Sequence, residues 1–172
     1  MKIKYIAIIT LISLTIGCKK SHEKPILNSV QQDHKTEKNM EQNKLTDFAN
    51  RYSSAWSGQK PEKVAEFFAS DGMLQVNDGE PAVGTRAITQ VAKGFMDAFP
   101  DMIVSMDSLT TKSDTTRFYW TLTGTNNAPG GTGNKVKISG FEEWTMNEEG
   151  LVQESIGHFN AEDYNRQLNG ID

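Results

Sequence analysis

The sequence predicts an α+β domain in which helices from the first half of the chain cover a sheet formed by the second half. Three segments within residues 115–159 alternate apolar and polar side chains, as strands with one buried face do. Earlier segments repeat apolar residues at helical spacing. One strand phase also carries Glu142 between Ile138 and Trp144. Because a packed core would leave such a carboxylate without hydrogen-bond partners, we expect a partly hollow interior.

The elements are expected in the following order along the chain. A first helix carries Leu45, Phe48, Tyr52 and Trp56 on one face, and a second helix begins at Pro61, with Phe67 and Phe68 on its inner side. The later elements are a strand at Met73–Val76, a helix capped by Thr85 and stopped by Pro100, a strand at Met102–Thr110, strands at 115–124, 135–146 and 151–159, and a closing helix at 161–168.

The start of the chain is typical of a secretory signal peptide. Two lysines precede an apolar run, Tyr5–Gly17, which is shorter than the roughly 20 residues that a membrane-spanning helix needs. Cys18 follows directly, and this arrangement resembles a bacterial lipoprotein lipobox, although Thr15 stands where leucine is usual. The resemblance implies a lipid on Cys18 and a place in the cell envelope, on the periplasmic or outer-membrane face. The alternative is an ordinary secreted protein with an incidental cysteine.

We therefore divide the chain into a signal peptide at 1–17, a lipidated and flexible tether at 18–43, and one domain at 44–172. The tether has too few apolar side chains to order itself. Its histidines, His22 and His34, have no further metal ligands nearby, so no metal site is expected. No cofactor is expected either.

Charge and cysteine content exclude several functions. From Lys44 onward the chain has 11 basic and 18 acidic residues, a net charge of −7. Binding to a phosphate backbone needs a basic surface, so no nucleic-acid partner is expected. The single cysteine excludes an internal disulfide and any multi-cysteine metal site.

Several short motifs, in order, resemble the nuclear-transport-factor-2-like superfamily and its SnoaL-like branch, which includes polyketide cyclases. They are Arg51-Tyr52 followed by Trp56, Gly84-Thr85-Arg86-Ala87-Ile88, Phe99-Pro100-Asp101 and Gly140–Trp144. The resemblance implies a cone-shaped α+β barrel, in which a strongly bent, mostly antiparallel sheet wraps around three N-terminal helices. It also implies a pocket at the open end and a possible homodimer. This fold hosts enzymes, binding modules and docking domains, so it does not settle function.

The resemblance also suggests roles for single residues. Ketosteroid isomerases share this fold, and their two hydrogen-bond donors to the enolate fall on Tyr52 and Glu142 of this sequence. Their proton-moving carboxylate falls on Val76, unless Asp78 replaces it. The acid/base aspartate of SnoaL-like cyclases falls on Gly157. These departures count against isomerase and cyclase activity.

From chemistry alone, Glu142 and His158 form the best acid/base pair, because a buried carboxylate has a raised pKa and a histidine can share its proton. Two alternatives stay open. Glu142 could form an ion pair with Arg117 or Lys137 on neighbouring strands. His158 could be a hydrogen-bonded core residue or point to solvent.

Aromatic residues are the candidates for contact with a ligand, although core packing is the alternative for each of them. They are Tyr52, Trp56, Trp120 and Trp144. Three functional hypotheses follow. The first is a membrane-anchored lipoprotein that binds a small, mostly apolar molecule. The second is a cofactor-independent isomerase, cyclase or hydratase that uses Glu142 and His158. The third is a dimerising interaction module with a vestigial pocket, which a cavity below about 300 Å³ would favour.

Overall fold

The computed structural model describes residues 24–171, and the side chains of residues 35–171. The predicted signal peptide, Cys18 and His22 lie outside the described residues, as does the side chain of His34. The chain divides into two compact units, one ending at Asn39 and the other beginning at Met40. None of the helices in the described part has the length and apolar character needed to cross a membrane.

Helix α1 spans Lys24–Ser57, so it includes most of the segment that we expected to be a flexible tether. The sequence analysis did not predict this helix, and the role of the segment as a flexible tether stays a prediction. The segment contains no glycine, and Pro25 lies in the first turn, where its missing N–H breaks no hydrogen bond. The side chains of residues 35–44 are all exposed. The boundary between tether and domain stays a prediction.

The next elements are α2 at Pro61–Ala65, β1 at Phe68–Val76 and β2 at Ala82–Val83. The sequence placed Phe68 on the second helix and began the strand at Met73; both predictions are wrong. The pairing of β1 with β6 is irregular between Phe68 and Met73, and this irregularity contains Ser70, Asp71 and Gly72, whose composition is typical of a turn. A bulge keeps the strand continuous there.

Helix α3 spans Gly84–Ala98 and ends just before Pro100, as expected. The predicted cap is wrong, because Thr85 lies inside the helix. Val83 holds the capping position with an extended backbone and no side-chain hydrogen bond. The buried side of α3 carries Ile88, Ala92 and Met96.

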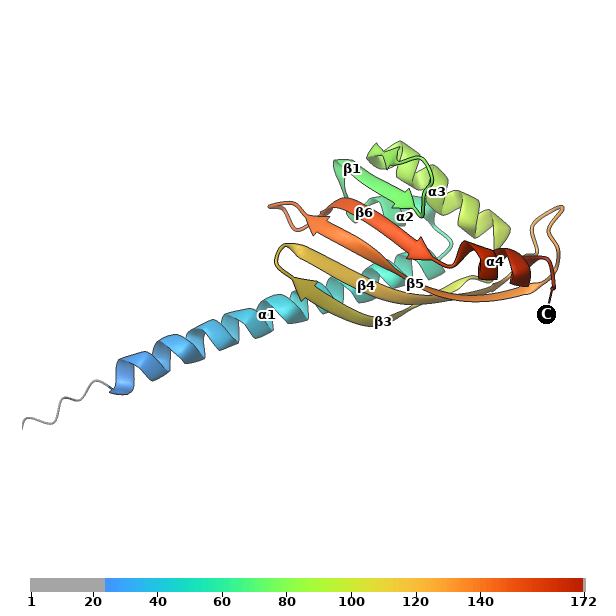
Figure 1. The fold of residues 1–172 in the computed structure, drawn as a ribbon. Helices are drawn as coiled ribbons and strands as arrows, with labels where there is room; N and C mark the ends of the chain where they lie inside the picture. The colour runs from blue at the N-terminus through green and yellow to red at the C-terminus, as the bar shows by residue number, and fades with distance from the viewer. Residues whose placement is uncertain (1–23, 172) are drawn as a thin grey trace, which may run out of the picture. The chain divides into compact units, whose positions relative to one another are not determined.

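The other strands are β3 at Ile103–Lys112, β4 at Thr115–Thr125, β5 at Lys135–Met146 and β6 at Val152–Phe159, and α4 follows at Ala161–Leu168. Six strands form one sheet in the order β2-β1-β6-β5-β4-β3 (Figure 1). The β1–β6 pair is parallel and all other pairs are antiparallel. The α+β fold and the curved sheet are confirmed. The sheet does not close into a barrel, because β2 and β3 are free edges.

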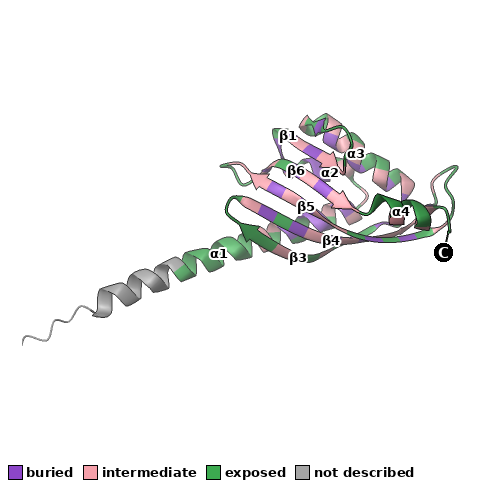
Figure 2. Cartoon of the chain, in the orientation of Figure 1, coloured by how far each residue is buried: buried purple, intermediate pink, exposed green. Residues whose placement is uncertain are grey.

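One face of the sheet packs against the helices. On β4 the buried side chains are Phe118, Trp120 and Leu122, in the phase that the sequence predicted. They share a single apolar core with Tyr52 of α1 and Ile88 of α3. Buried positions recur along the central strands in Figure 2. The inner face of the sheet is therefore covered by α1 and α3.

Strand β6 contains a bulge that decides which of its side chains face the core. Val152 pairs with Met146 and Glu154 pairs with Thr145, so one residue of β6 is inserted between them. Val152 and Ser155 are both fully buried, although they are three residues apart. Beyond the bulge, the inward phase is therefore Ser155, Gly157 and Phe159.

Candidate functional site

The site is built around Glu142, a carboxylate on the inner face of β5 whose residue is only 7% exposed. Its Oε2 accepts three hydrogen bonds. The Tyr52 hydroxyl donates at 3.0 Å, the Trp144 indole N–H at 2.8 Å and the Ser155 hydroxyl at 2.7 Å. These donors come from α1, β5 and β6, so helix and sheet must both be in place before the carboxylate has its partners. Burial without these bonds would be costly for such a group.

Aromatic packing fixes the donors. The rings of Tyr52 and Trp144 meet edge to face with centroids 5.2 Å apart, and Phe118 stacks on Trp144 at 4.7 Å. Tyr52 and Trp144 are completely buried and are not among the residues that line the cavity. The structure therefore places these two predicted ligand-binding residues at the carboxylate, where they hold Glu142.

Burial also controls the protonation of this cluster. Desolvation raises the pKa of Glu142, although the hydrogen bonds from Ser155, Trp144 and Tyr52 act in the opposite direction. The pKa of Tyr52 is raised well above its usual value by burial first, and then by the negative charge of Glu142. The indole of Trp56 lies near enough to the Tyr52 hydroxyl to oppose this rise, yet its N–H has no acceptor in good hydrogen-bond geometry. Tyr52 therefore stays a neutral hydrogen-bond donor.

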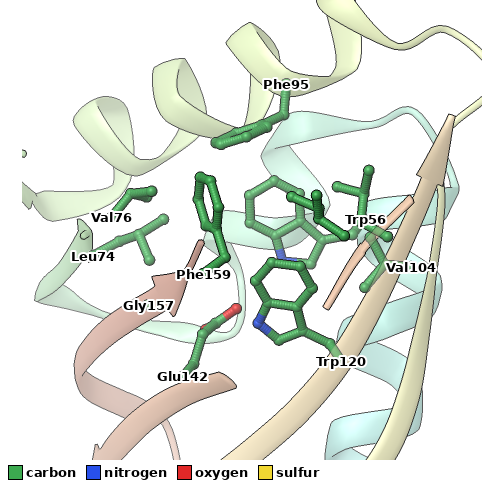
Figure 3. A pocket seen from close by; sticks show the side chains of 11 residues that line it. Trp56, Leu74, Val76, Phe95, Val104, Trp120, Glu142, Gly157 and Phe159 are labelled. Carbon is green, nitrogen blue, oxygen red and sulfur yellow. The ribbon is translucent and has the colours of Figure 1, made fainter. Parts of the chain in front are cut away.

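A cavity of about 50 Å³, partly open to solvent, lies beside Glu142. Most of its wall is apolar, and Glu142 is its single titratable residue. The lining residues are Trp56, Leu74, Val76, Phe95, Val104, Trp120, Leu122, Ile138, Glu142, Gly157 and Phe159 (Figure 3). Sites for drug-sized ligands have volumes of about 300–1,000 Å³, so this cavity lies below the size at which we expected the interaction-module hypothesis to be favoured. It has room only for a much smaller molecule or for one end of a larger one.

Trp56 and Trp120, two of the four candidates for contact with a ligand, line the cavity. Their contact with a ligand stays a prediction. Each residue is 8% exposed, and neither indole N–H has a hydrogen-bond partner in the described part of the chain. In Figure 3 the indole nitrogen of Trp120 and the carboxyl group of Glu142 border the same space. The polar atoms of the lining side chains are therefore two N–H donors and one carboxyl group.

A glycine sets the position of Trp120. Gly140 is its register partner on β5, and a Cβ atom at Gly140 would lie 2.7 Å from the indole Cζ2. The same Cβ would collide with the carbonyl oxygen of His158. The indole can lie across β5 only because position 140 has no side chain.

The predicted pair of Glu142 and His158 is not brought together. Gly157 is the register partner of Glu142, whereas His158 pairs with Phe141 and its ring lies 4.8 Å from the Phe141 ring. Since successive strand residues point to opposite faces, Glu142 faces the core and His158 faces the other side of the sheet. The prediction that the two form an acid/base pair is wrong in its geometry.

The ion-pair alternatives for Glu142 are not observed either. Arg117 donates to Glu143 at 2.7 Å, on the outer face. Lys137 is exposed on that same face. Within residues 35–171 no group of three or more His, Cys, Asp or Glu side chains is arranged to hold a metal ion.

Sequence reasoning missed two parts of the site. Neither alternating set of residues in 151–159 is cleanly polar, so only the bulge in β6 decides that Ser155 faces the core. Phe95 lies on α3, and its place in the cavity wall depends on how this helix packs on the sheet. The available signal for Ser155 was that Ser155 and Gly157 stand two residues apart, which places both small residues on the same face of the strand.

A model of the SnoaL-like polyketide cyclase family matches residues 46–168. The chain belongs to this family. No curated protein matches the sequence significantly.

Several solved structures share this fold at low sequence identity. One is a hypothetical protein with a ketosteroid isomerase-like fold from Catenulispora acidiphila, in complex with trimethylamine; it is 13% identical, with a TM-score of 0.64 over 73% of this chain and 93% of that one. AclR, a proposed hydroxylase from Streptomyces galilaeus, is 21% identical, with a TM-score of 0.62 over 74% and 96%. A phenazine biosynthesis-related protein from Pseudomonas aeruginosa is 15% identical, with a TM-score of 0.58 over 70% and 84%. At these identities the likeness supports the fold alone.

Proposed function

We propose that this SnoaL-like protein is a membrane-anchored lipoprotein whose domain binds a small, mostly apolar molecule in the cavity beside Glu142. One observation carries the proposal: a partly open cavity with an apolar wall borders a buried carboxylate and two indole N–H groups without partners. Such a wall with a few fixed polar groups is the usual composition of a ligand site.

Binding is favoured over acid/base catalysis by the chemistry of the cavity wall. The residue that we expected to share a proton with Glu142 is missing from the wall, because His158 lies on the other face of the sheet. Glu142 is the single titratable residue of the wall, and its Oε2 already accepts three hydrogen bonds. The trimethylamine complex of one structural relative supports a ligand of only a few heavy atoms.

The lipid anchor rests on the position of Cys18 after the apolar run of the signal peptide. Two or more acyl chains would hold the protein stably on a membrane, whereas a single chain gives only marginal binding. A place on the periplasmic or outer-membrane face and a homodimer belong to the same proposal.

Native mass spectrometry of the full chain, extracted in detergent from the membranes of its own host, tests the ligand-binding function. We expect a small-molecule adduct on the wild type that is lost when Trp120 is replaced by leucine, which removes the indole from the cavity wall. Glu143→Gln on the outer face is the matched control and should keep the adduct. A chain that carries no adduct and binds no small molecule added to it would contradict the proposal and favour the interaction-module hypothesis.

A further inference from the structure

The class of ligand follows from the polar hydrogens at the cavity, given the proposed binding function. We propose that the cavity selects neutral molecules with a hydrogen-bond-accepting oxygen, such as a ketone, ester or ether, and that the indole N–H groups of Trp56 and Trp120 bind this oxygen. The proposal rests on two donors, each on a cavity-lining residue that is more than nine-tenths buried, that have no acceptor in good hydrogen-bond geometry in the described protein. Trp120 is the stronger case, because the indole of Trp56 lies close to the Tyr52 hydroxyl.

A buried donor without an acceptor destabilises the folded protein, so its presence in the cavity wall indicates which kind of ligand the cavity binds. Leaving a buried N–H unsatisfied costs about 1–3 kcal/mol, and few native groups are left so. The two residues that carry such groups both line one cavity here, whereas the third indole of the domain, that of Trp144, has its acceptor on Glu142 at 2.8 Å. An acceptor from outside the chain satisfies Trp56 and Trp120.

The other ligand classes fit less well. A cation would meet the positive ends of two N–H dipoles, and the Oε2 of Glu142 already accepts three hydrogen bonds. An anion would lie beside the carboxyl group of Glu142 in a site with little water to screen it. A pure hydrocarbon would leave both donors unpaired. A neutral acceptor satisfies the donors and brings no charge.

The experiment compares three probes of four heavy atoms each with the full chain in detergent: acetone, 2-methylpropene and trimethylammonium. All three match the small cavity, and they differ in having an acceptor, no polar group or a positive charge. Weak, roughly millimolar binding is expected of ligands this small. Titrations followed by ¹H–¹⁵N NMR report on the indole N–H signals of Trp56, Trp120 and Trp144, which the three Trp→Phe variants assign.

We expect acetone to bind most tightly and to move the indole signals of Trp56 and Trp120 downfield, while the Trp144 signal moves little because its N–H is already bonded. Trp120→Phe and Trp56→Phe keep a ring in the wall but remove the N–H. Each should weaken acetone binding about three- to tenfold, the usual worth of one hydrogen bond, and leave 2-methylpropene within twofold.

Equal binding of acetone and 2-methylpropene, tighter binding of trimethylammonium, or unmoved indole signals on acetone binding would each overturn the inference. Any of these results would leave the proposed binding function standing, because the cavity would still hold a small molecule. Binding of none of the three probes would overturn the inference and count against the proposed function as well.

Discussion

The cluster around Glu142 can be tested by removing the acceptor from three buried donors. Glu142→Ala leaves the Tyr52 hydroxyl, the Trp144 indole N–H and the Ser155 hydroxyl without their shared partner. At about 1–3 kcal/mol for each unsatisfied donor, the expected loss in free energy of unfolding is at least about 3 kcal/mol. Glu142→Gln keeps the shape and one acceptor oxygen, so we expect it to lose less than half as much.

The measurement is urea unfolding of the wild type and both variants, followed by far-UV circular dichroism, because the tryptophan signal itself will change. Small domains have a total stability of about 5–15 kcal/mol, so a loss of this size shifts the midpoint clearly. Equal losses for the alanine and glutamine variants, or a loss below about 1 kcal/mol for alanine, would refute the role that we assign to the three hydrogen bonds.

The same variants carry a pH test. Burial raises the pKa of Glu142 in the folded protein, so the folded state holds this proton more tightly than the unfolded chain does. The resulting stabilisation is complete below the unfolded pKa and is lost as the pH rises through the folded pKa. Glu142→Gln has no such proton. The stability of the wild type relative to the glutamine variant should therefore fall from acidic to neutral pH; a difference that rises would contradict the raised pKa.

Three further predictions concern other parts of the chain. Gly140→Ala should destabilise the fold and displace Trp120, whereas Gly94→Ala, on an exposed helix position with nothing within 4 Å, should stabilise it slightly; thermal melts that rank them the other way would contradict the role of Gly140. Asp101→Asn should remove a stabilisation that is present above the unfolded pKa and lost on acidification, because the backbone N–H of Thr125 lowers the pKa of Asp101. An acid unfolding midpoint unchanged by that variant would argue otherwise. Cys18→Ser should release the protein from membrane fractions, and unchanged partitioning on an immunoblot would exclude a lipid anchor there.

Period-2 patterning was enough to find the central residue of the site. Phe118, Trp120 and Leu122 on β4 and Glu142 on β5 face the core as predicted, because regular antiparallel pairing preserves strand alternation. Alternation fails where a strand bulges. The residue inserted in β6 shifts the alternation by one position, so the side chains that follow it point to the opposite faces. Ser155 therefore reaches Glu142, and His158 does not.

Other errors came from local signals that tertiary structure overrides. Ser70, Asp71 and Gly72 have the composition of a turn, but they form an irregularity within β1. The strand pairs with β6 both before it, at Phe68, and after it, at Met73. Thr85 has the chemistry of a helix cap, yet the chain enters α3 through Val83 from the short strand β2. The unpartnered state of the Trp56 and Trp120 indoles depends on three-dimensional packing and has no sequence signal.

The position of β6 determines when this domain can assemble. It is the last of the six described strands in the sequence, yet it lies inside the sheet, paired with β1 on one side and β5 on the other. The first strand must therefore wait, unpaired along that edge, through the synthesis of the three strands that follow α3. A chain without residues 152–159 would leave β1 and β5 with no strand between them, so the sheet would stay divided into two parts until this short segment is added.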